Sequence, residues 1–217
     1  MDLIHTLLDL VLHLNKHLDY ACAHYGHWIY LLLFVIVFAE TGLVVTPFLP
    51  GDALLFTVGA IAARGALDPW ILLVSLTAAA FLGGVSNYAI GRKVGDRFFT
   101  PGARILKRKY LDQTHAFFEK HGPKAVILAR FLPLFRTFVP FVAGMGRMAY
   151  GKYLLDTAIG AALWVILMMG AGWFFGGISF IQNHFEVAVI GIILVSMLPA
   201  AYEIAKHLLQ KKTPPRP

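Results

Sequence analysis

Charged residues are scarce in this chain, at 14% of 217 residues, whereas hydrophobic residues make up 58% and the mean hydropathy is +0.68. Several long stretches therefore have no polar face to present to water, which argues against an ordinary soluble protein. Cysteine is nearly absent as well. Cys22 stands alone, so that neither an intrachain disulfide nor a cysteine-based zinc site can form. The composition predicts an integral membrane protein.

The chain also lacks the motifs of common hydrolytic and nucleotide-binding sites. Neither HExxH, GxSxG nor a P-loop occurs, and no compact group of His, Asp and Glu indicates a metal site. We therefore expect a protein that is not an enzyme and needs no cofactor. The N-terminus lacks the cationic region of a secretory signal, so we expect it to be retained.

The formal net charge of +7 is concentrated beside the apolar stretches. Residues 92–124 hold nine basic residues against three acidic ones, and the tail 206–217 is basic too. Short basic segments that flank apolar spans mark the cytoplasmic side of a membrane, so we place both segments there. Residues 92–124 match no recognisable nucleic-acid-binding module, and we expect no nucleic-acid partner.

Three stretches are apolar enough to span a bilayer. Residues 70–91 contain no charge and are long enough to cross a hydrocarbon core of about 30 Å. Residues 153–181 and 187–205 predict two further spans. Near the N-terminus, apolar residues recur at helical spacing, which predicts an amphipathic helix on the membrane surface or, alternatively, a helix that packs on the bundle.

Two further apolar regions, residues 28–63 and 125–148, are interrupted by proline. Proline removes a backbone donor and clashes with the preceding turn, so we expect the helices to break at Pro47, Pro50, Pro133 and Pro140. In the second region the limb before Pro133 would rise only about 12 Å and cannot cross. Because basic residues flank both ends, we predict a re-entrant hairpin that enters from the cytoplasm and returns there.

A weak internal repeat relates the two interrupted regions. The tripeptide FLP occurs at residues 48–50 and 131–133, and counting 22 residues onward reaches Trp70 and Tyr153, where spans are predicted. Two hairpins separated by one spanning helix must open on opposite sides, which resembles the inverted repeats of transporters. The predicted fold is therefore an all-α polytopic membrane protein with two opposed re-entrant, broken-helix hairpins. Its single domain comprises an amphipathic surface helix (1–24), a first hairpin (28–63), a transmembrane helix (70–91), a basic cytoplasmic loop (92–124), a second hairpin (125–148), two transmembrane helices (153–181 and 187–205) and a basic tail (206–217).

Four ionisable residues fall within or beside these breaks: Glu40, Asp52, Arg130 and Arg136. A charge at bilayer depth costs at least about 2.5 to 3.5 kcal/mol, so we expect these residues to pair across a polar cavity. The arginines lie on either side of Pro133 and are predicted to converge on one anion, because a guanidinium binds phosphate as a planar, bidentate fork. Snorkelling toward the headgroups is the alternative, mainly for Arg130.

The acidic residues are candidates for proton exchange. Glu40 interrupts an apolar limb, and its alternative role is a fixed ion pair. Asp52 follows Pro50 and Gly51, where it would alternatively cap the returning helix. For Asp156 we favour a place in the first turn of a helix over a pairing with an arginine.

The sequence resembles the DedA family of bacterial inner-membrane proteins, which is related to eukaryotic membrane proteins with a SNARE-associated or VTT domain. The resemblance extends over nearly the whole chain and is closest in pattern to the bacterial members. The stretches that carry it are FAETGLVVTPFLPGDALLF (38–56), NYAIGRKVG (87–95), YLDQTHAFFEKHG (110–122) and ILARFLPLFRTFVPFVAGMGRM (127–148).

The resemblance implies opposed re-entrant hairpins and transport of lipid across the membrane. Members are linked to the return of undecaprenyl phosphate, the lipid carrier of envelope synthesis, to the cytoplasmic leaflet, and proton-motive force is implicated. The resemblance also implies that the acidic pair Glu40 and Asp52 and the arginine pair Arg130 and Arg136 are required. Relatives often have Asp where this chain has Gly84, which puts proton coupling in question.

Our hypothesis is a lipid flippase in the bacterial inner membrane, with a cytoplasmic C-terminus. Arg130 and Arg136 bind the phosphate headgroup of a polyprenyl phosphate or a phospholipid, and Glu40 or Asp52 exchanges protons. The alternatives are a proton-coupled transporter of a small solute or ion, a phospholipid scramblase, a lipid-phosphate hydrolase and a membrane-assembly protein. The sequence leaves the side of the N-terminus and the formation of a homo-oligomer open.

Overall fold

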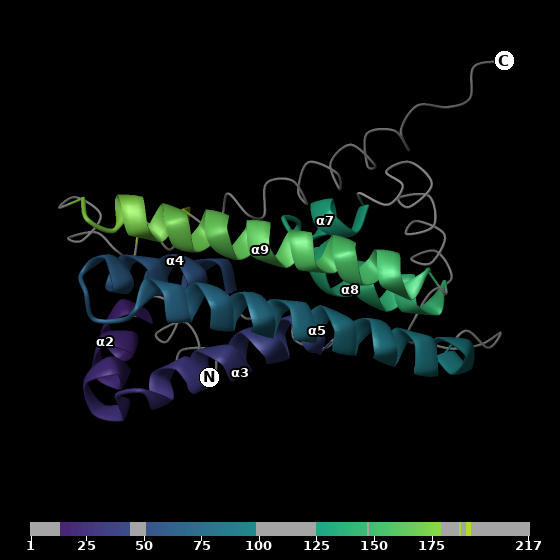
Figure 1. Cartoon of the computed structure of the whole chain (residues 1–217), viewed down its shortest axis with the longest axis horizontal. Helices are drawn as coiled ribbons and strands as arrows, with labels where there is room; N and C mark the ends of the chain where they lie inside the picture. Colours follow the sequence, from purple (N-terminus) through teal and green to yellow (C-terminus); the bar gives the residue numbers. More distant parts are fainter. Residues whose placement is uncertain are drawn as a thin grey trace, which may run out of the picture.

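The computed structural model describes residues 14–43, 51–98, 125–146 and 148–178, together with Val187, Ile190 and Gly191. Every regular element within these residues is an α-helix, which confirms the predicted helical class. Outside the described residues lie Pro47, Pro50, the basic tail and almost all of the third predicted span (187–205). Of the basic segment 92–124, predicted as a loop or helix, residues 92–98 are described and are helical. The helices lie side by side as an elongated bundle (Figure 1).

Two long helices run along the length of the bundle. Helices α5 (Pro69–Phe98) and α9 (Tyr150–Phe175) are apolar and long enough to cross a membrane, since 26 residues rise about 39 Å. They include residues 70–91 and most of 153–181, where spans are predicted. Asp68 caps α5, because its Oδ1 accepts hydrogen bonds from the backbone N–H groups of Trp70 at 2.8 Å and Ile71 at 3.0 Å. Proline at the first helical position completes this start signal.

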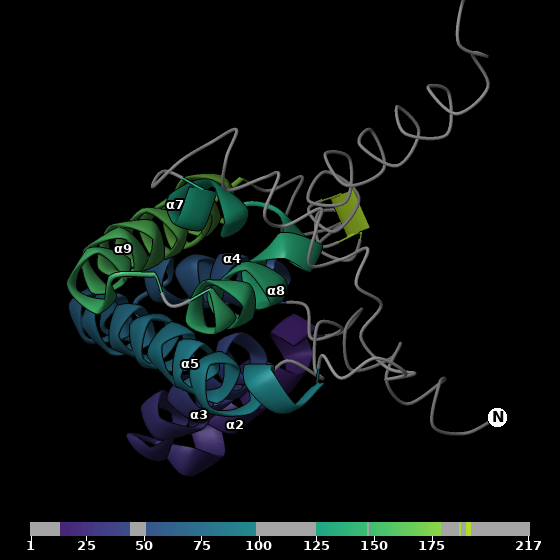
Figure 2. The ribbon, with the colours of Figure 1, turned by 90° about the vertical axis from the view of Figure 1, so that its right-hand side faces the viewer.

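Four shorter helices pack around the long ones. They are α3 (Trp28–Gly42), α4 (Gly51–Ala63), α7 (Ala125–Ala129) and α8 (Pro133–Met145). Helix α3 packs on α5 and α7 packs on α9, each on the long helix that follows it in the chain. Helices α4 and α8 do the reverse: α4 packs chiefly on α9, and α8 packs chiefly on α5. Figure 2, which looks along the bundle, shows α4 and α8 between the layer of α7 and α9 and the layer of α3 and α5.

Glycines permit the close approach of α4 to α9 and of α8 to α5. A Cβ at Gly59 would lie 2.1 Å from the carbonyl oxygen of Met169, and one at Gly144 would lie 2.1 Å from that of Tyr88. Any larger residue would force these backbones apart. Small residues at such crossings are typical of helix packing in membranes, where van der Waals contact replaces the hydrophobic drive.

The predicted break at Pro140 is wrong, because α8 continues through it. Pro140 leaves one carbonyl group, that of Arg136 four residues earlier, without its usual donor and disturbs the turn that precedes it. Asn87 of α5 supports the same turn from outside the helix, since its Nδ2 donates a hydrogen bond to the next carbonyl oxygen, that of Thr137, at 2.9 Å. Pro133 instead lies in the first turn of α8, directly after residues 130–132, which separate α7 from α8.

The described part of the N-terminal region is α2 (Leu14–Tyr25), which lies at one end of the bundle (Figure 1). Leu18 and Ala21 of α2 are buried in the hydrophobic core, and Asp19 forms an exposed ion pair with Arg64 at 3.0 Å. This part of the helix therefore packs on the bundle, as in the alternative interpretation of the N-terminal pattern.

Candidate functional site

Three buried charges meet where α3, α4 and α8 come together. Arg136 Nη1 donates to Asp52 Oδ1 at 2.8 Å, and Arg136 Nη2 donates to Glu40 Oε1 at 2.5 Å. The side chains of Arg136 and Glu40 are 4% and 0% exposed, and that of Asp52 is 12% exposed. We call these three residues the ion-pair cluster. The structure thus brings together three of the four charged residues that the sequence singles out, from positions up to 96 residues apart.

The ends of the short helices place these charges. Asp52 and Arg136 lie near the starts of α4 and α8, whereas Glu40 lies near the end of α3. A carboxylate at a helix N-terminus is favoured by the helix dipole, and one at a C-terminus is disfavoured. Asp52 is therefore stabilised by its own helix, and Glu40 depends on Arg136. Gly51 makes room for the Glu40 side chain, because a Cβ there would collide with Glu40 Oε2.

Trp164 in the middle of α9 completes the cluster. Its Nε1 donates to Asp52 Oδ1 at 2.8 Å, and its ring centroid lies 4.9 Å from Arg136 Cζ in a cation–π arrangement. The side chain is fully buried. Sequence reasoning missed Trp164, although a tryptophan in the middle of a span, away from the interfacial aromatic belts, was a usable signal.

Asn87 connects the ends of two short helices beside the cluster. Its Nδ2 donates to the carbonyl oxygen of Thr41 at 3.3 Å, near the end of α3, and to that of Thr137 at 2.9 Å in α8. The residue is fully buried. Sequence reasoning missed this residue too, and its signal was an amide inside a span without charges. Asn87 therefore holds the ends of α3 and α8 in register with α5.

The fourth candidate, Arg130, lies outside the ion-pair cluster. It follows α7 directly, is 4% exposed, and donates from Nη2 to the carbonyl oxygen of Ala80 on α5 at 3.1 Å. The snorkelling alternative is wrong for Arg130, because the guanidinium is buried between helices. Arg130 and Arg136 thus reach different partners, one a backbone carbonyl and the other two carboxylates.

Asp156 does not lie in the first turn of a helix as expected. Helix α9 begins at Tyr150, which places Asp156 in its second turn, largely buried. No ion pair joins Asp156 to an arginine among the residues that the structure describes. Those residues also contain no group of three or more His, Cys, Asp or Glu side chains placed to hold a metal ion.

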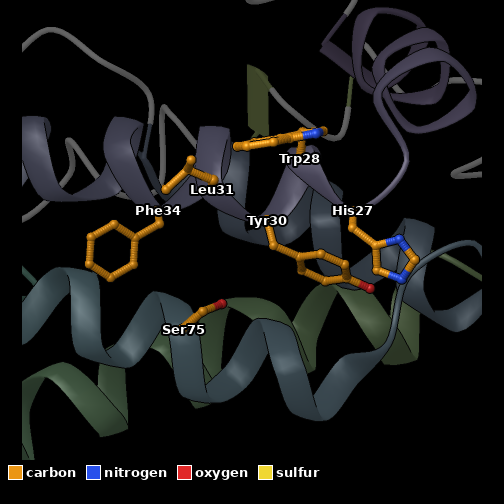
Figure 3. A pocket seen from close by; sticks show the side chains of 6 residues that line it. All are labelled: His27, Trp28, Tyr30, Leu31, Phe34 and Ser75. Carbon is orange, nitrogen blue, oxygen red and sulfur yellow. The ribbon is translucent and has the colours of Figure 1, made fainter.

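A hollow of about 480 Å³ lies on the outer surface between α3 and α5, away from the ion-pair cluster (Figure 3). Its lining is aromatic and aliphatic with one histidine and one serine, and it includes no Asp, Glu, Lys or Arg. The lining residues are His27, Trp28, Tyr30, Leu31, Phe34 and Ser75. Such a surface suits hydrocarbon, whereas the ion-pair cluster suits a charged group. We therefore take the ion-pair cluster, with Arg130 beside it, as the candidate site.

Comparisons with known proteins identify the family to which the chain belongs. The model of the VTT domain family matches residues 49–174, which include Asp52, both arginines and Trp164. Protein DedA of Escherichia coli K12 is 50% identical over 210 residues, which is 95% of this chain and 96% of that protein. An uncharacterized membrane protein of Mycobacterium leprae is 45% identical over 76% of this chain and 75% of its own length.

A more distant relative is the inner membrane protein YqjA of Escherichia coli K12, which is 30% identical over 83% of each chain. No solved structure matches the chain significantly. The extent of the family match and the identity to proteins named for the membrane decide the assignment. The chain belongs to the VTT-domain family of membrane proteins, the family of bacterial DedA.

Proposed function

We propose that the chain is a lipid translocase, which carries a lipid with a phosphate headgroup, such as undecaprenyl phosphate, across the bacterial inner membrane. The observation that carries the proposal is the ion-pair cluster, buried among apolar helices in a membrane protein. Ionisable residues at bilayer depth are costly, and they mark substrate or ion pathways. A relative named as an inner membrane protein supports the location.

The same proposal takes the short helices as two opposed re-entrant hairpins related by an inverted repeat. Helices of 13 and 15 residues rise only about 20 and 22 Å, less than the hydrocarbon core. The exchanged packing supports an inverted relation, because the second short helix of each half packs on the long helix of the other half. Broken helices that meet at the midplane are where transporters bind substrates. The basic residues of the tail support a cytoplasmic C-terminus.

Glu40, Asp52 and a phosphate headgroup would compete for Arg136, and this competition would drive a transport cycle. In this structure each Nη atom of Arg136 donates to one carboxylate, so a phosphate there would meet two negative neighbours that already neutralise the guanidinium. A proton on Glu40 or Asp52 removes one negative partner, and a phosphate oxygen then takes its place. Proton uptake and headgroup binding therefore favour each other, which is a coupling between two sites. The prenyl tail stays in lipid while the headgroup passes the cluster.

The experiment is transbilayer movement of labelled undecaprenyl phosphate in liposomes that contain the purified protein, with and without a proton gradient. Undecaprenol, which lacks the phosphate, and a labelled phospholipid serve as matched controls. We expect movement of the prenyl phosphate alone, faster with the gradient. Equal movement of all three lipids would indicate a scramblase, and no movement of any would contradict the proposal. The cycle includes no covalent chemistry, so release of inorganic phosphate would also contradict it.

A further inference from the structure

Arg130 is a buried cation with an unused hydrogen-bond donor. Only 4% of the residue is exposed, and its Nη2 donates to Ala80 O on α5. Its Nη1 has no hydrogen-bond partner. A guanidinium has five N–H donors, and a buried donor left unpaired costs about 1 to 3 kcal/mol. The burial of this side chain therefore has a cost that Ala80 offsets only in part.

None of the described carboxylates forms an ion pair with Arg130. Glu40 and Asp52 are both held by Arg136, and Asp156 of α9 makes no ion pair with Arg130 either. A buried charge without a partner is strongly unfavourable, and proteins normally pair it or supply a ligand. Arg130 thus has the charge, the burial and the unused donor of a binding group for an anion.

Two glycines form the surface on which the Arg130 side chain lies. A Cβ at Gly84 of α5 would lie 2.7 Å from Arg130 Nη2, and one at Gly160 of α9 would lie 3.1 Å from Arg130 Cδ. The Tyr153 hydroxyl donates to Gly84 O at 2.7 Å and lies 3.4 Å from the same Cβ position. The single hydrogen of this hydroxyl is therefore used by Gly84 O, and the unused donor beside position 84 is Arg130 Nη1.

We propose that Arg130 forms an oxyanion site, in which a phosphate group binds the unused Nη1 donor and acts as the counter-ion of the guanidinium. Position 84 decides whether this site is open. With glycine there, the guanidinium lies against α5 and its Nη1 is available to the phosphate. A carboxylate at position 84 would lie beside the guanidinium and compete with the phosphate for it.

This inference rests on the proposed function where it takes a lipid headgroup as the source of the phosphate. It assigns different tasks to the two arginines. Arg136 is engaged by two carboxylates in this arrangement of the helices, so the headgroup meets Arg130 first. Arg136 becomes available only after one of its carboxylates is protonated. The site suits any phosphate group, whether that of a phosphate monoester or free inorganic phosphate.

The test compares Gly84→Asp with Gly84→Asn, two side chains of nearly equal volume that differ in charge. Binding of inorganic phosphate, farnesyl phosphate and uncharged farnesol to the full-length protein in detergent is measured by calorimetry. We expect wild-type protein to bind farnesyl phosphate and not farnesol. We expect Gly84→Asp to bind at least tenfold more weakly than Gly84→Asn, because only Asp supplies a competing carboxylate.

Thermal unfolding of the same variants separates loss of the site from damage to the fold. Gly84→Asp is expected to unfold at a temperature equal to or above that of Gly84→Asn, since its carboxylate pairs with Arg130. Equal affinity of the two variants for farnesyl phosphate overturns the inference. If both variants fail to fold, Arg130→Gln and Arg130→Lys replace them. A tenfold loss with Gln and a smaller loss with Lys then support the site, and unchanged affinity with Gln overturns it.

The probes distinguish this inference from the proposed function. One outcome is that inorganic phosphate binds in a manner that depends on residue 84 while farnesyl phosphate neither binds nor moves across liposomes. That result supports the oxyanion site and contradicts the lipid translocase. If farnesyl phosphate binds and undecaprenyl phosphate is transported regardless of residues 84 and 130, only the inference falls. Binding of farnesol as tight as that of farnesyl phosphate, or no binding of any phosphate probe, overturns the site.

Discussion

Two arginines six residues apart lie in opposite electrostatic surroundings. Arg136 is held by two carboxylates and an indole, whereas Arg130 is held by one backbone carbonyl and two glycine surfaces. Both are buried to a similar degree. The difference is therefore in partners, not in depth. We infer that the two arginines have different roles. Arg136 belongs to a preformed cluster that protonation would open, and Arg130 has a donor available for an anion.

The largest effect on stability is expected from removing Arg136. The Arg136→Gln variant leaves Glu40 and Asp52 buried together without their cation. Loss of one partner of a buried ion pair typically costs about 3 to 5 kcal/mol, and we expect a loss of stability in this range. Denaturant unfolding in detergent measures it. The triple variant Arg136→Gln, Glu40→Gln and Asp52→Asn should recover most of the stability without recovering transport. Wild-type stability in Arg136→Gln would contradict the account.

Trp164 tests how far the cluster extends into α9. Trp164→Phe keeps an aromatic ring near Arg136 and removes the Nε1 donor to Asp52. Hydrogen bonds to charged groups contribute about 1.5 to 3 kcal/mol, so we expect a loss of this size in unfolding free energy. Binding of farnesyl phosphate to Arg130 should be unaffected, which serves as the control. An equal loss in binding would show that the two arginines share one site.

The Asn87→Leu variant removes the amide that contacts both Thr41 O and Thr137 O. It leaves the backbone at Pro140 without this compensating donor, and we expect destabilisation of about 1 to 3 kcal/mol. Hydrogen exchange should rise in α8 around Thr137 more than in α4. Uniform exchange across the bundle would contradict the role of Asn87 in holding α8 on α5.

The smallest effect on stability is expected at Arg130. Arg130→Gln removes one buried charge and one hydrogen bond without leaving any carboxylate unpaired, so the loss should stay within about 0.5 to 1.5 kcal/mol. Transport of undecaprenyl phosphate should nevertheless fall at least tenfold. Trp164→Phe is expected to show the opposite pattern, a larger loss of stability with unchanged binding of farnesyl phosphate. A loss of stability as large as that of Arg136→Gln would remove the distinction between the arginines.

The sequence was informative where composition and local pattern decide the structure. The uncharged stretch after Pro69 predicts α5. The placement of charges beside prolines predicts that four charged residues pair; three of them, Glu40, Asp52 and Arg136, do meet, and Arg130 does not. Pro140 was misjudged because a neighbouring helix supplies a donor at that turn, which no local rule contains. Trp164 and Asn87 were missed for the same reason: both act on residues tens of positions away. Asp156 was misplaced because α9 begins at Tyr150, a few residues before the predicted span.

The most direct test of the account is proton-coupled transport of undecaprenyl phosphate by wild-type protein beside Glu40→Gln, in liposomes with an imposed pH gradient. Glu40→Gln keeps the shape of the side chain and removes its charge, so Arg136 stays partly free at every pH. We predict that the variant still binds the lipid but no longer responds to the gradient. If the gradient accelerates transport by Glu40→Gln as much as by the wild type, Glu40 is not the proton-exchanging group in the cluster.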